Sequence, residues 1–244
     1  RRPELLADAT DAIESTAGHG AKVVAVAGDV ADPDHRRALA DAARATGTVR
    51  LVVNNASTLG ASPLPALVDL DPATYLRTLE VNLVAPMALV AALADQLGDG
   101  ATVVNVSSDA AVEPYDHWGG YGSSKAALDH ASMILAAEHP TWRVLAVDPG
   151  DLDTELHRSA FPDEDLSDLP GPEAAVPGFR RLIDGSLPLG RYPARELVRR
   201  PRWAPPSSRR WTSVRRCRWA SRWTPPTRRT SRPRLAAPPA TASA

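Results

Sequence analysis

The sequence of 244 residues contains a single cysteine, Cys217, so it can form neither an internal disulfide bond nor a cluster of cysteines around a metal ion. This absence excludes a disulfide scaffold and leads us to expect a cytoplasmic protein. Long hydrophobic runs are also absent, because the longest, residues 83–94, is too short to cross a bilayer and contains Pro86. We therefore expect neither a membrane-spanning helix nor a membrane partner.

Acidic residues are absent from residues 199–244, which contain 13 Arg, 8 Pro and 4 Trp. Residues 1–198, in contrast, carry 15 basic and 29 acidic side chains. Because residues 199–244 show no helical or strand periodicity, we expect a disordered tail after a domain formed by residues 1–198. The tail composition fits three interpretations: a reading frame translated out of register, which we favour, an inert solvated tail, or, least of all, an arm that binds nucleic acid.

Within residues 1–198, short stretches rich in Val, Leu and Ala alternate with longer stretches of helical periodicity. This alternation predicts an α/β fold, a Rossmann-like, doubly wound parallel sheet with helices on both faces. Two helices begin with the same signal, an Asp-Pro pair at residues 32–33 and 71–72 whose carboxylate caps the helix. We predict strands at 22–27, 50–54, 101–106 and 142–148, a weak strand at 189–192, and helices at 4–16, 33–46, 72–96, 119–138 and 173–184.

The helix predicted at 119–138 carries Tyr121 and Lys125, which are four residues apart and therefore on one helix face. A nearby ammonium group favours phenolate over phenol. We therefore expect Lys125 to lower the pKa of Tyr121 toward the range where it exchanges a proton at neutral pH. The alternative interpretation is an unrelated surface pair on an amphipathic helix.

Polar residues follow the predicted strands at their carboxyl ends, where ligands bind in open α/β sheets. Ser107 and Ser108 follow strand 101–106, and Ser108 stands thirteen residues before Tyr121, so hydroxyl and phenol can converge. Asn82 lies inside an apolar helical segment, where a buried amide needs a partner. Other strand ends carry Asp29 and Val30, Asn54, Asn55 and Ala56, and Asp148, Pro149 and Gly150 with Thr154 following.

Taken in order, these motifs resemble the short-chain dehydrogenase/reductase family of Rossmann-type nicotinamide oxidoreductases, over residues 1 to about 160. The resemblance implies that Tyr121 is the general acid in carbonyl reduction and the general base in alcohol oxidation. Lys125 would lower the pKa of that tyrosine and bind the nicotinamide ribose. Ser108, favoured over Ser107 by its interval to the tyrosine, would hold the substrate oxygen, and Asn82 would join a water relay that returns the proton to solvent.

The same resemblance implies NADP or NAD as cofactor. Arg1 and Arg2 would fall where the family selects between the two, and arginine suits the 2′-phosphate of NADP. A solvated pair of arginines flanking a helix is the alternative. The other implied cofactor contacts are Asp29 and Val30 at the adenine, Asn54, Asn55 and Ala56 along the cleft, and Tyr121, Lys125, Pro149, Gly150 and Thr154 at the nicotinamide end.

The family's first strand, its glycine-rich phosphate-binding turn and its second strand do not precede Arg1, where the sequence begins without Met. We therefore expect a truncated domain in which strand 22–27 stands apart from the other strands, and a polypeptide whose activity is impaired. The alternative to an enzyme is a truncated or misread derivative, or a binding protein, that keeps the fold without the chemistry.

The expected substrate is a small molecule with a carbonyl or secondary alcohol group. Trp118 and the loop 157–170 are candidate walls of its pocket. The six histidines show no ligand spacing, so we expect no metal site. From the habit of the family we expect a homo-oligomer, a dimer or a tetramer.

Overall fold

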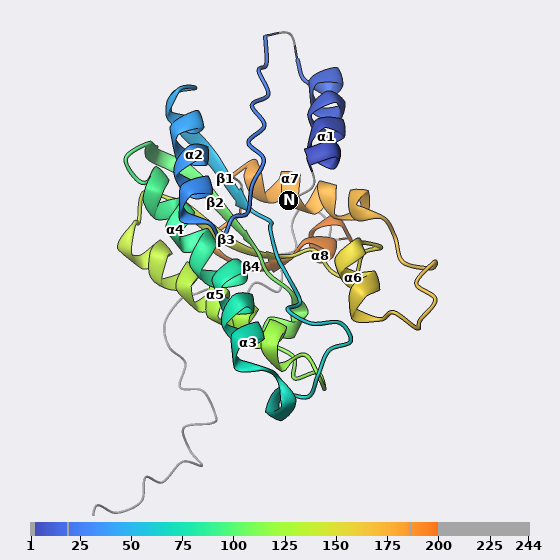
Figure 1. Ribbon diagram of the computed structural model, residues 1–244. Helices are drawn as coiled ribbons and strands as arrows, with labels where there is room; N and C mark the ends of the chain where they lie inside the picture. The colour runs from blue at the N-terminus through green and yellow to red at the C-terminus, as the bar shows by residue number, and fades with distance from the viewer. Residues whose placement is uncertain (1–2, 19, 186, 200–244) are drawn as a thin grey trace, which may run out of the picture. The chain divides into compact units, whose positions relative to one another are not determined.

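The computed structural model describes residues 3–18, 20–185 and 187–199 (Figure 1). Four strands form one sheet in the order β1-β2-β3-β4, and every neighbouring pair is parallel. The sheet confirms the predicted Rossmann-like α/β fold with a parallel sheet. The strands are β1 (Val49–Asn54), β2 (Leu97–Val106), β3 (Arg143–Asp148) and β4 (Gly190–Pro193).

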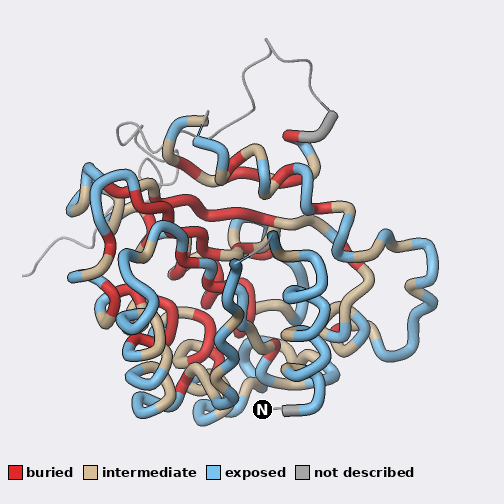
Figure 2. Tube along the Cα trace, turned by 90° about the horizontal axis from the view of Figure 1, so that it is seen from above, coloured by how far each residue is buried: buried red, intermediate tan, exposed pale blue. Residues whose placement is uncertain are grey.

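Side chains of the two central strands alternate between two hydrophobic clusters, one on each face of the sheet. Val103 and Val144 belong to the first cluster, whereas their neighbours Val104 and Leu145 belong to the second. Successive strand residues point to opposite faces, so a sheet with clusters on both faces needs apolar residues at every position. Figure 2 shows this burial as continuous red stretches along the strands.

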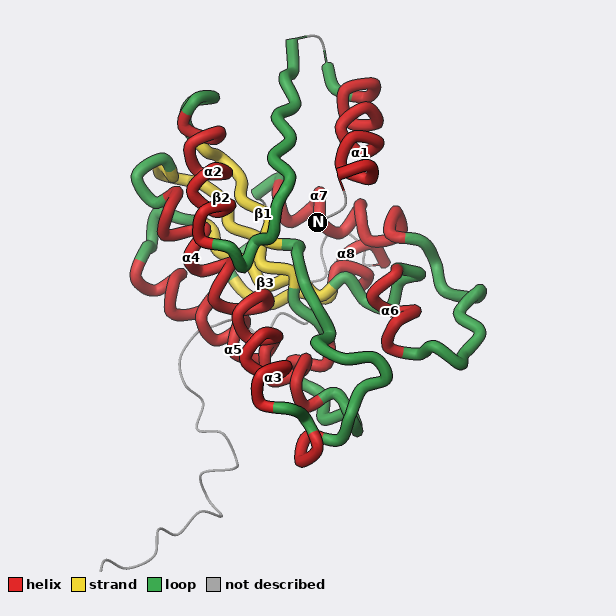
Figure 3. The backbone as a smooth tube through the Cα atoms, viewed as in Figure 1, coloured by secondary structure: helices red, strands yellow, loops and turns green. Residues whose placement is uncertain are grey.

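Helices cover both faces, as the two clusters require. Helices α2, α4 and α5 contribute residues to the first cluster, and η4, α7 and α8 contribute to the second. Figure 3 shows the helices packed around the strands. The helical elements are α1 (Pro3–Thr16), α2 (Pro33–Arg44), η1 (Leu67–Asp69), α3 (Pro72–Leu79), η2 (Glu80–Val84), α4 (Ala85–Leu93), η3 (Asp109–Ala111), α5 (Gly119–Glu138), α6 (Glu155–Ala160), η4 (Pro172–Ala175), α7 (Val176–Ile183) and α8 (Ala194–Arg199).

The two Asp-Pro pairs start helices as predicted. Asp32 accepts a hydrogen bond from the backbone N–H of Asp34 at 2.9 Å, and Asp71 accepts one from Thr74 at 2.8 Å. Each carboxylate thereby satisfies a backbone donor that the first helical turn leaves unpaired. The predicted helix 72–96 is correct in place but consists of α3, a π-helical turn (η2) and α4.

The predicted strand at 22–27 is wrong. These residues form a loop, none of them is buried, and the side chain of Val24 is 46% exposed. An extended segment becomes a strand only when a neighbouring chain completes its backbone hydrogen bonds, and no strand among the described residues pairs with it. The preceding helix α1 forms as predicted, yet none of its residues from 4 to 16 is buried.

The structure does not test two further predictions, the disordered tail and the absence of a membrane partner. The predicted tail, 199–244, lies outside the described residues except for Arg199 at the end of α8. The helical run Pro72–Leu93 is long and apolar enough to span a membrane by length and composition; an 18-residue stretch of it has a mean hydropathy of 1.5, and 39% of that stretch is buried. Because core helices pass the same test, the absence of a membrane partner stays a prediction.

Candidate active site

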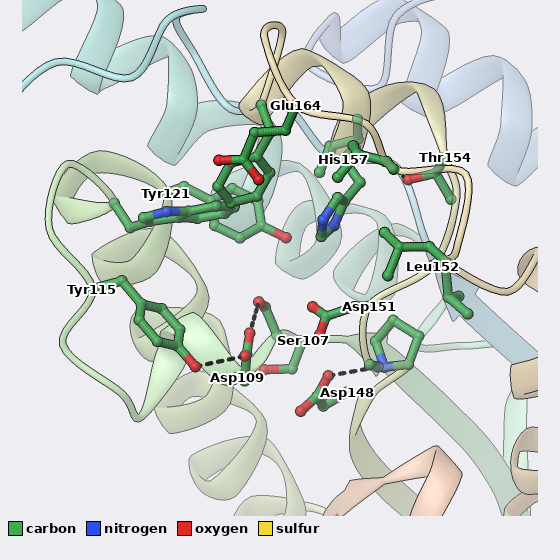
Figure 4. Close-up of a pocket in the computed structure, with 18 residues that line it drawn as sticks. Ser107, Asp109, Tyr115, Tyr121, Asp148, Asp151, Leu152, Thr154, His157 and Glu164 are labelled. Carbon is green, nitrogen blue, oxygen red and sulfur yellow. Dashed lines mark hydrogen bonds between the residues drawn. The ribbon is translucent and has the colours of Figure 1, made fainter.

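A pocket of about 490 Å³ opens where strands β2 and β3 end (Figure 4). Its size is typical of small-molecule sites. Ser107 and Ser108 enter it from the end of β2, Pro149 and Gly150 from the turn after β3, and Tyr121 from the start of α5. The carboxyl ends of parallel strands meet at one sheet edge, which is why residues far apart in sequence share this pocket.

Close packing of α5 against the short helix η3 brings Tyr121 beside Ser108. A Cβ atom on Gly122 would lie 2.6 Å from the carbonyl oxygen of Ala110, so only glycine permits this approach. Ser108 begins η3, where its Oγ accepts a hydrogen bond from the backbone N–H of Ala110 at 3.2 Å. The predicted convergence of serine hydroxyl and phenol is therefore present in the structure.

The protonation of Tyr121 differs from the prediction. Burial raises the pKa of Tyr121 to about 12, and the nearby hydroxyls of Ser108 and Ser57 oppose this without overcoming it. The Lys125 ammonium lies 5.6 Å from the centre of the tyrosine ring. Desolvation disfavours the phenolate more strongly than its surroundings favour it, so the net shift of the tyrosine pKa is upward, whereas a downward shift was predicted.

Lys125 is itself deeply buried, with only 2% of the residue exposed. Its Nζ donates a hydrogen bond to the carbonyl oxygen of Val106 at 2.8 Å, at the end of β2. Burial lowers the pKa of Lys125 to about 8, against the opposing charge of Asp129. The ammonium is therefore held at the strand end, beside the pocket rather than in its wall.

Asn82 lies in the π-helical turn η2 and is fully buried. Its Oδ1 accepts hydrogen bonds from the Ser57 hydroxyl at 3.1 Å and the Thr58 N–H at 2.9 Å. Its Nδ2 donates to the Thr58 carbonyl and to the Ser124 hydroxyl, both at 2.9 Å. Asn82 thus reaches the site through Ser57, whose hydroxyl acts to lower the pKa of Tyr121. π-Helical turns occur often at functional sites.

Three residues predicted at the nicotinamide end line the pocket: Pro149, Gly150 and Thr154. The Gly150 N–H donates to the Asp148 carboxylate at 2.9 Å, and Gly150 has a φ of +78°, which glycine adopts without strain. Thr154 caps α6 by accepting a hydrogen bond from the His157 N–H at 3.2 Å. The turn after β3 is therefore fixed by its own hydrogen bonds.

The residues predicted along the rest of the cofactor are not part of this pocket wall. Asn54 donates to the Asn105 side chain at 2.7 Å, inside the sheet, while Asn55 and Ala56 are exposed after β1. Asp29 pairs with Arg77 at 2.5 Å, and the Val30 carbonyl accepts a hydrogen bond from Arg36 at 2.6 Å. Arg1 and Arg2 lie outside the described residues.

Three comparisons with known proteins agree with this geometry. The family described as short chain dehydrogenase matches residues 1–165. The chain belongs to the short-chain dehydrogenase/reductase family. The sequence resemblance is thereby confirmed.

Individual relatives show how far the likeness extends. A sepiapterin reductase from Meriones unguiculatus is 39% identical over 129 residues, which cover 51% of this chain and 49% of that protein. This chain therefore aligns with about half the length of that relative. An uncharacterised oxidoreductase of Saccharomyces cerevisiae is 34% identical over 182 residues, 71% of this chain and 70% of that protein. A short chain dehydrogenase from Escherichia coli, solved with NADPH, shares the fold with a TM-score of 0.68 at 24% identity, covering 80% and 83% of the two chains.

In this member of the family, aromatic and acidic side chains enclose the pocket. Trp118 contacts the rings of Tyr121 and Phe161, with centroids 5.6 and 5.7 Å apart. Trp118 and several residues of the loop 157–170 line the pocket, where the sequence predicted the substrate walls. Carboxylates also line it, and one of them, Asp109, accepts hydrogen bonds from the Tyr115 hydroxyl at 2.9 Å and the Ser108 hydroxyl at 3.0 Å. The acidic lining residues are Asp109, Asp148, Asp151 and Glu164.

Two site residues were missed by the sequence reasoning. Ser57 directly follows Asn54, Asn55 and Ala56, and this place just beyond a strand end was the available signal for its hydroxyl. Arg191 carried no signal, because it lies in a strand too short to predict firmly and its partners come from three other elements.

The residues present fit the nicotinamide half of a dinucleotide. The pocket joins a phenol hydroxyl, a serine hydroxyl and a fixed turn, with a buried ammonium beside the phenol ring. For metals, residues 3–18, 20–185 and 187–199 contain no cluster of three His, Cys, Asp or Glu side chains that could hold an ion. The predicted absence of a metal site stays a prediction.

Proposed function

We propose that this protein is an NAD(P)-dependent oxidoreductase that interconverts a carbonyl group and a secondary alcohol. The observation that carries the proposal is the meeting of Tyr121 and Ser108 in one pocket, with the Lys125 ammonium 5.6 Å from the tyrosine ring. Relatives named as reductases and oxidoreductases support it. Phenol, hydroxyl and cation together are a set suited to moving a proton at a substrate oxygen.

In this proposal the nicotinamide supplies or accepts the hydride, and side chains of this protein donate or accept the proton. A pKa of about 12 keeps Tyr121 protonated at neutral pH, so in reduction its hydroxyl can donate a proton to the substrate oxygen. Ser108 holds that oxygen by a hydrogen bond. The surrounding aromatic rings limit the access of water, which strengthens both interactions.

Lys125 stabilises the phenolate that remains after Tyr121 has donated its proton. Because its pKa is about 8, the ammonium form predominates at neutral pH. Asn82 holds Ser57 by a hydrogen bond. The Ser57 hydroxyl is thereby a second hydroxyl, besides that of Ser108, that acts on the phenol of Tyr121. The proposed water relay through Asn82 would have to use groups other than its side-chain amide, because that amide already makes four hydrogen bonds.

For the cofactor we propose NADP or NAD, with Pro149, Gly150 and Thr154 at the nicotinamide and Tyr121 and Lys125 at its ribose. The assignment of Asp29, Val30, Asn54, Asn55 and Ala56 to the rest of the cofactor is part of the same proposal, as is the preference for NADP through Arg1 and Arg2. We also propose that the protein is cytoplasmic and forms a homo-oligomer.

The pocket lining also points to a class of carbonyl compound. Trp118 and Phe161 offer flat apolar surfaces, and the four carboxylates favour hydrogen-bond donors or positive charge. We therefore propose substrates that combine a planar ring with N–H donors or a cationic group next to the reducible carbonyl.

Hydride transfer from reduced nicotinamide mononucleotide tests the function, because this donor has the nicotinamide and ribose but needs no adenine site. With a panel of aromatic ketones, we expect slow oxidation of the donor by the unmodified chain. We expect Tyr121→Phe to reduce the rate at least about a hundredfold. Tyr75→Phe is the matched control, because Tyr75 bonds Ser123 on another face of α5. Equal rates in the chain and in Tyr121→Phe would contradict the proposal.

A further inference from the structure

Helix α5 carries a row of three functional groups rather than two. Tyr121, Lys125 and Asp129 follow one another at intervals of four residues, so they lie along one helix face. Beyond this row stands Arg191 on β4, whose Nε lies 2.9 Å from the Asp129 carboxylate. The side chains of this ion pair are only 12% and 13% exposed.

The Arg191 guanidinium also reaches both strand ends that form the pocket. Its Nη2 donates to the carbonyl oxygen of Ser108 at 2.6 Å and lies 3.5 Å from the Asp148 carboxylate. Strand β4 places it there because Arg191 pairs with Ala146 of β3. One planar group with several fixed donors therefore connects α5, the serine after β2 and the last residue of β3.

The charges in this row depend on one another. Burial raises the pKa of Asp129, and the Ser107 hydroxyl, Arg191 and Lys125 all oppose that effect. For Lys125, burial lowers the pKa, and the negative charge of Asp129 opposes it. The remaining neighbours of Lys125 in the row are the Tyr121 ring and the Val106 carbonyl, neither of which carries a full charge. Asp148 of β3 shares Arg191 with Asp129.

We propose that Asp129 and Arg191 are positioning residues of this site: Arg191 fixes the Asp129 carboxylate, Asp129 keeps Lys125 charged, and the same guanidinium holds the backbone of Ser108. Neither residue is among those that line the pocket. Their contribution to turnover rests on the proposed function, but the coupling of the three charges does not. A bridge that merely fastened β4 to α5 would leave the titration of Lys125 unchanged.

The composition of the chain makes this coupling directly measurable. Lys22 and Lys125 are the only lysines, so isotope-labelled lysine gives two side-chain signals in a nuclear magnetic resonance titration, one exposed and one buried. We expect Asp129→Asn to lower the titration midpoint of Lys125 by at least about one pH unit, because one opposite charge nearby typically shifts a pKa by this much or more. The Lys22 signal should not move.

Glu138→Gln is the matched control, because Glu138 is an exposed carboxylate on the same helix. We expect it to leave the Lys125 midpoint in place. An unchanged midpoint in Asp129→Asn, or an equal change in Glu138→Gln, overturns the proposal. The unmodified chain supplies a test that needs no folded variant: the carboxyl carbon of Asp129 must show a step at the pH where Lys125 loses its proton, and its absence also overturns the proposal.

Arg191 is tested by how stability depends on pH. In Arg191→Met the folded-state pKa of Asp129 rises further, so the folded chain holds a proton that the unfolded chain has released. Stability must then fall as pH rises from about 4 to about 7, more steeply than in the unmodified chain. Adding Asp129→Asn should reduce the extra slope to the part that comes from Asp148, which also loses its contact with Arg191. Equal slopes in the single and double variants overturn the role given to Arg191. Neither measurement uses cofactor or substrate, so failure of the proposed function would leave these results intact.

Discussion

Residues 4–18 and 20–28 are built differently from the region around the carboxyl ends of β2 and β3. Residues 4–16 form a regular helix, but neither they nor residues 20–28 contain a buried side chain. The strand ends of β2 and β3, in contrast, combine fully buried apolar residues with a network of buried polar groups. A locally favourable sequence can make a helix, but burial from several elements is needed to fix functional groups at defined distances.

The largest expected effect comes from the buried amide at the site. Asn82→Ala removes four hydrogen bonds, which leaves the half-buried backbone N–H and carbonyl of Thr58 without these partners and takes one of two partners from the buried Ser124 hydroxyl. We expect a loss of about 4 kcal/mol in the free energy of unfolding, since each unsatisfied buried group costs about 1–3 kcal/mol. Urea unfolding measures it, with the exposed Asn55→Ala as control. A loss under about 1 kcal/mol would show that Asn82 is not an anchor.

The buried lysine should make stability depend on pH. The pKa of Lys125 is lowered from 10.5 to about 8 in the folded chain. Between these values the unfolded chain holds the proton that the folded chain has released, so stability rises with pH. The gain over Lys125→Met should approach about 3 kcal/mol from about pH 8 to about pH 10.5, one pKa unit corresponding to about 1.4 kcal/mol.

Lys22→Met serves as the exposed control and should follow the unmodified chain at every pH. Tyr121 acts with the opposite sign at higher pH, because its raised pKa makes stability fall above about pH 10. If the free energies of unfolding of the unmodified chain and of Lys125→Met changed equally with pH from about pH 8 to about pH 10.5, Lys125 would not be buried as described.

A pair of glycines compares the two regions directly. A Cβ on Gly122 would lie 2.6 Å from the Ala110 carbonyl, whereas one on Gly18 would meet nothing within 4 Å. We expect Gly122→Ala to cost about 2 kcal/mol through overpacking, and Gly18→Ala to change stability by less than about 0.5 kcal/mol. Thermal unfolding of both variants checks this, and equal effects would remove the contrast between the regions.

The smallest expected effect is that of removing residues 1–18. Because no residue from 4 to 16 is buried, the deletion should change the free energy of unfolding by less than about 0.5 kcal/mol. It should also leave the Lys125 titration unchanged. A large loss of stability would mean that α1 is part of the folded core.

Helices α2 and α3 and strands β1, β2 and β3 could be predicted because their signals are local: aspartate caps at the helix starts and runs of Val, Leu and Ala in the strands. Ser108 and Tyr121 could be paired because strand-end topology brings them to one edge. Residues 22–27 have the same local signal as a strand, but pairing depends on a neighbour that a local signal does not contain. The pKa of Tyr121 was predicted in the wrong direction because proximity to Lys125 is visible in the sequence and the extent of burial is not. Arg191 was not predicted as a site residue for a related reason, because its three partners come together only in the folded chain.

The central claim is that the pocket formed by Ser108, Tyr121 and the turn after β3 takes the nicotinamide end of a dinucleotide, with Lys125 at its ribose. Saturation-transfer magnetic resonance with reduced nicotinamide mononucleotide measures this without requiring turnover. The account predicts transfer to the nicotinamide and ribose protons with the unmodified chain and with Tyr75→Phe, and strong loss of the ribose signals with Lys125→Met. Equal transfer in all three, or none in the unmodified chain, would contradict it.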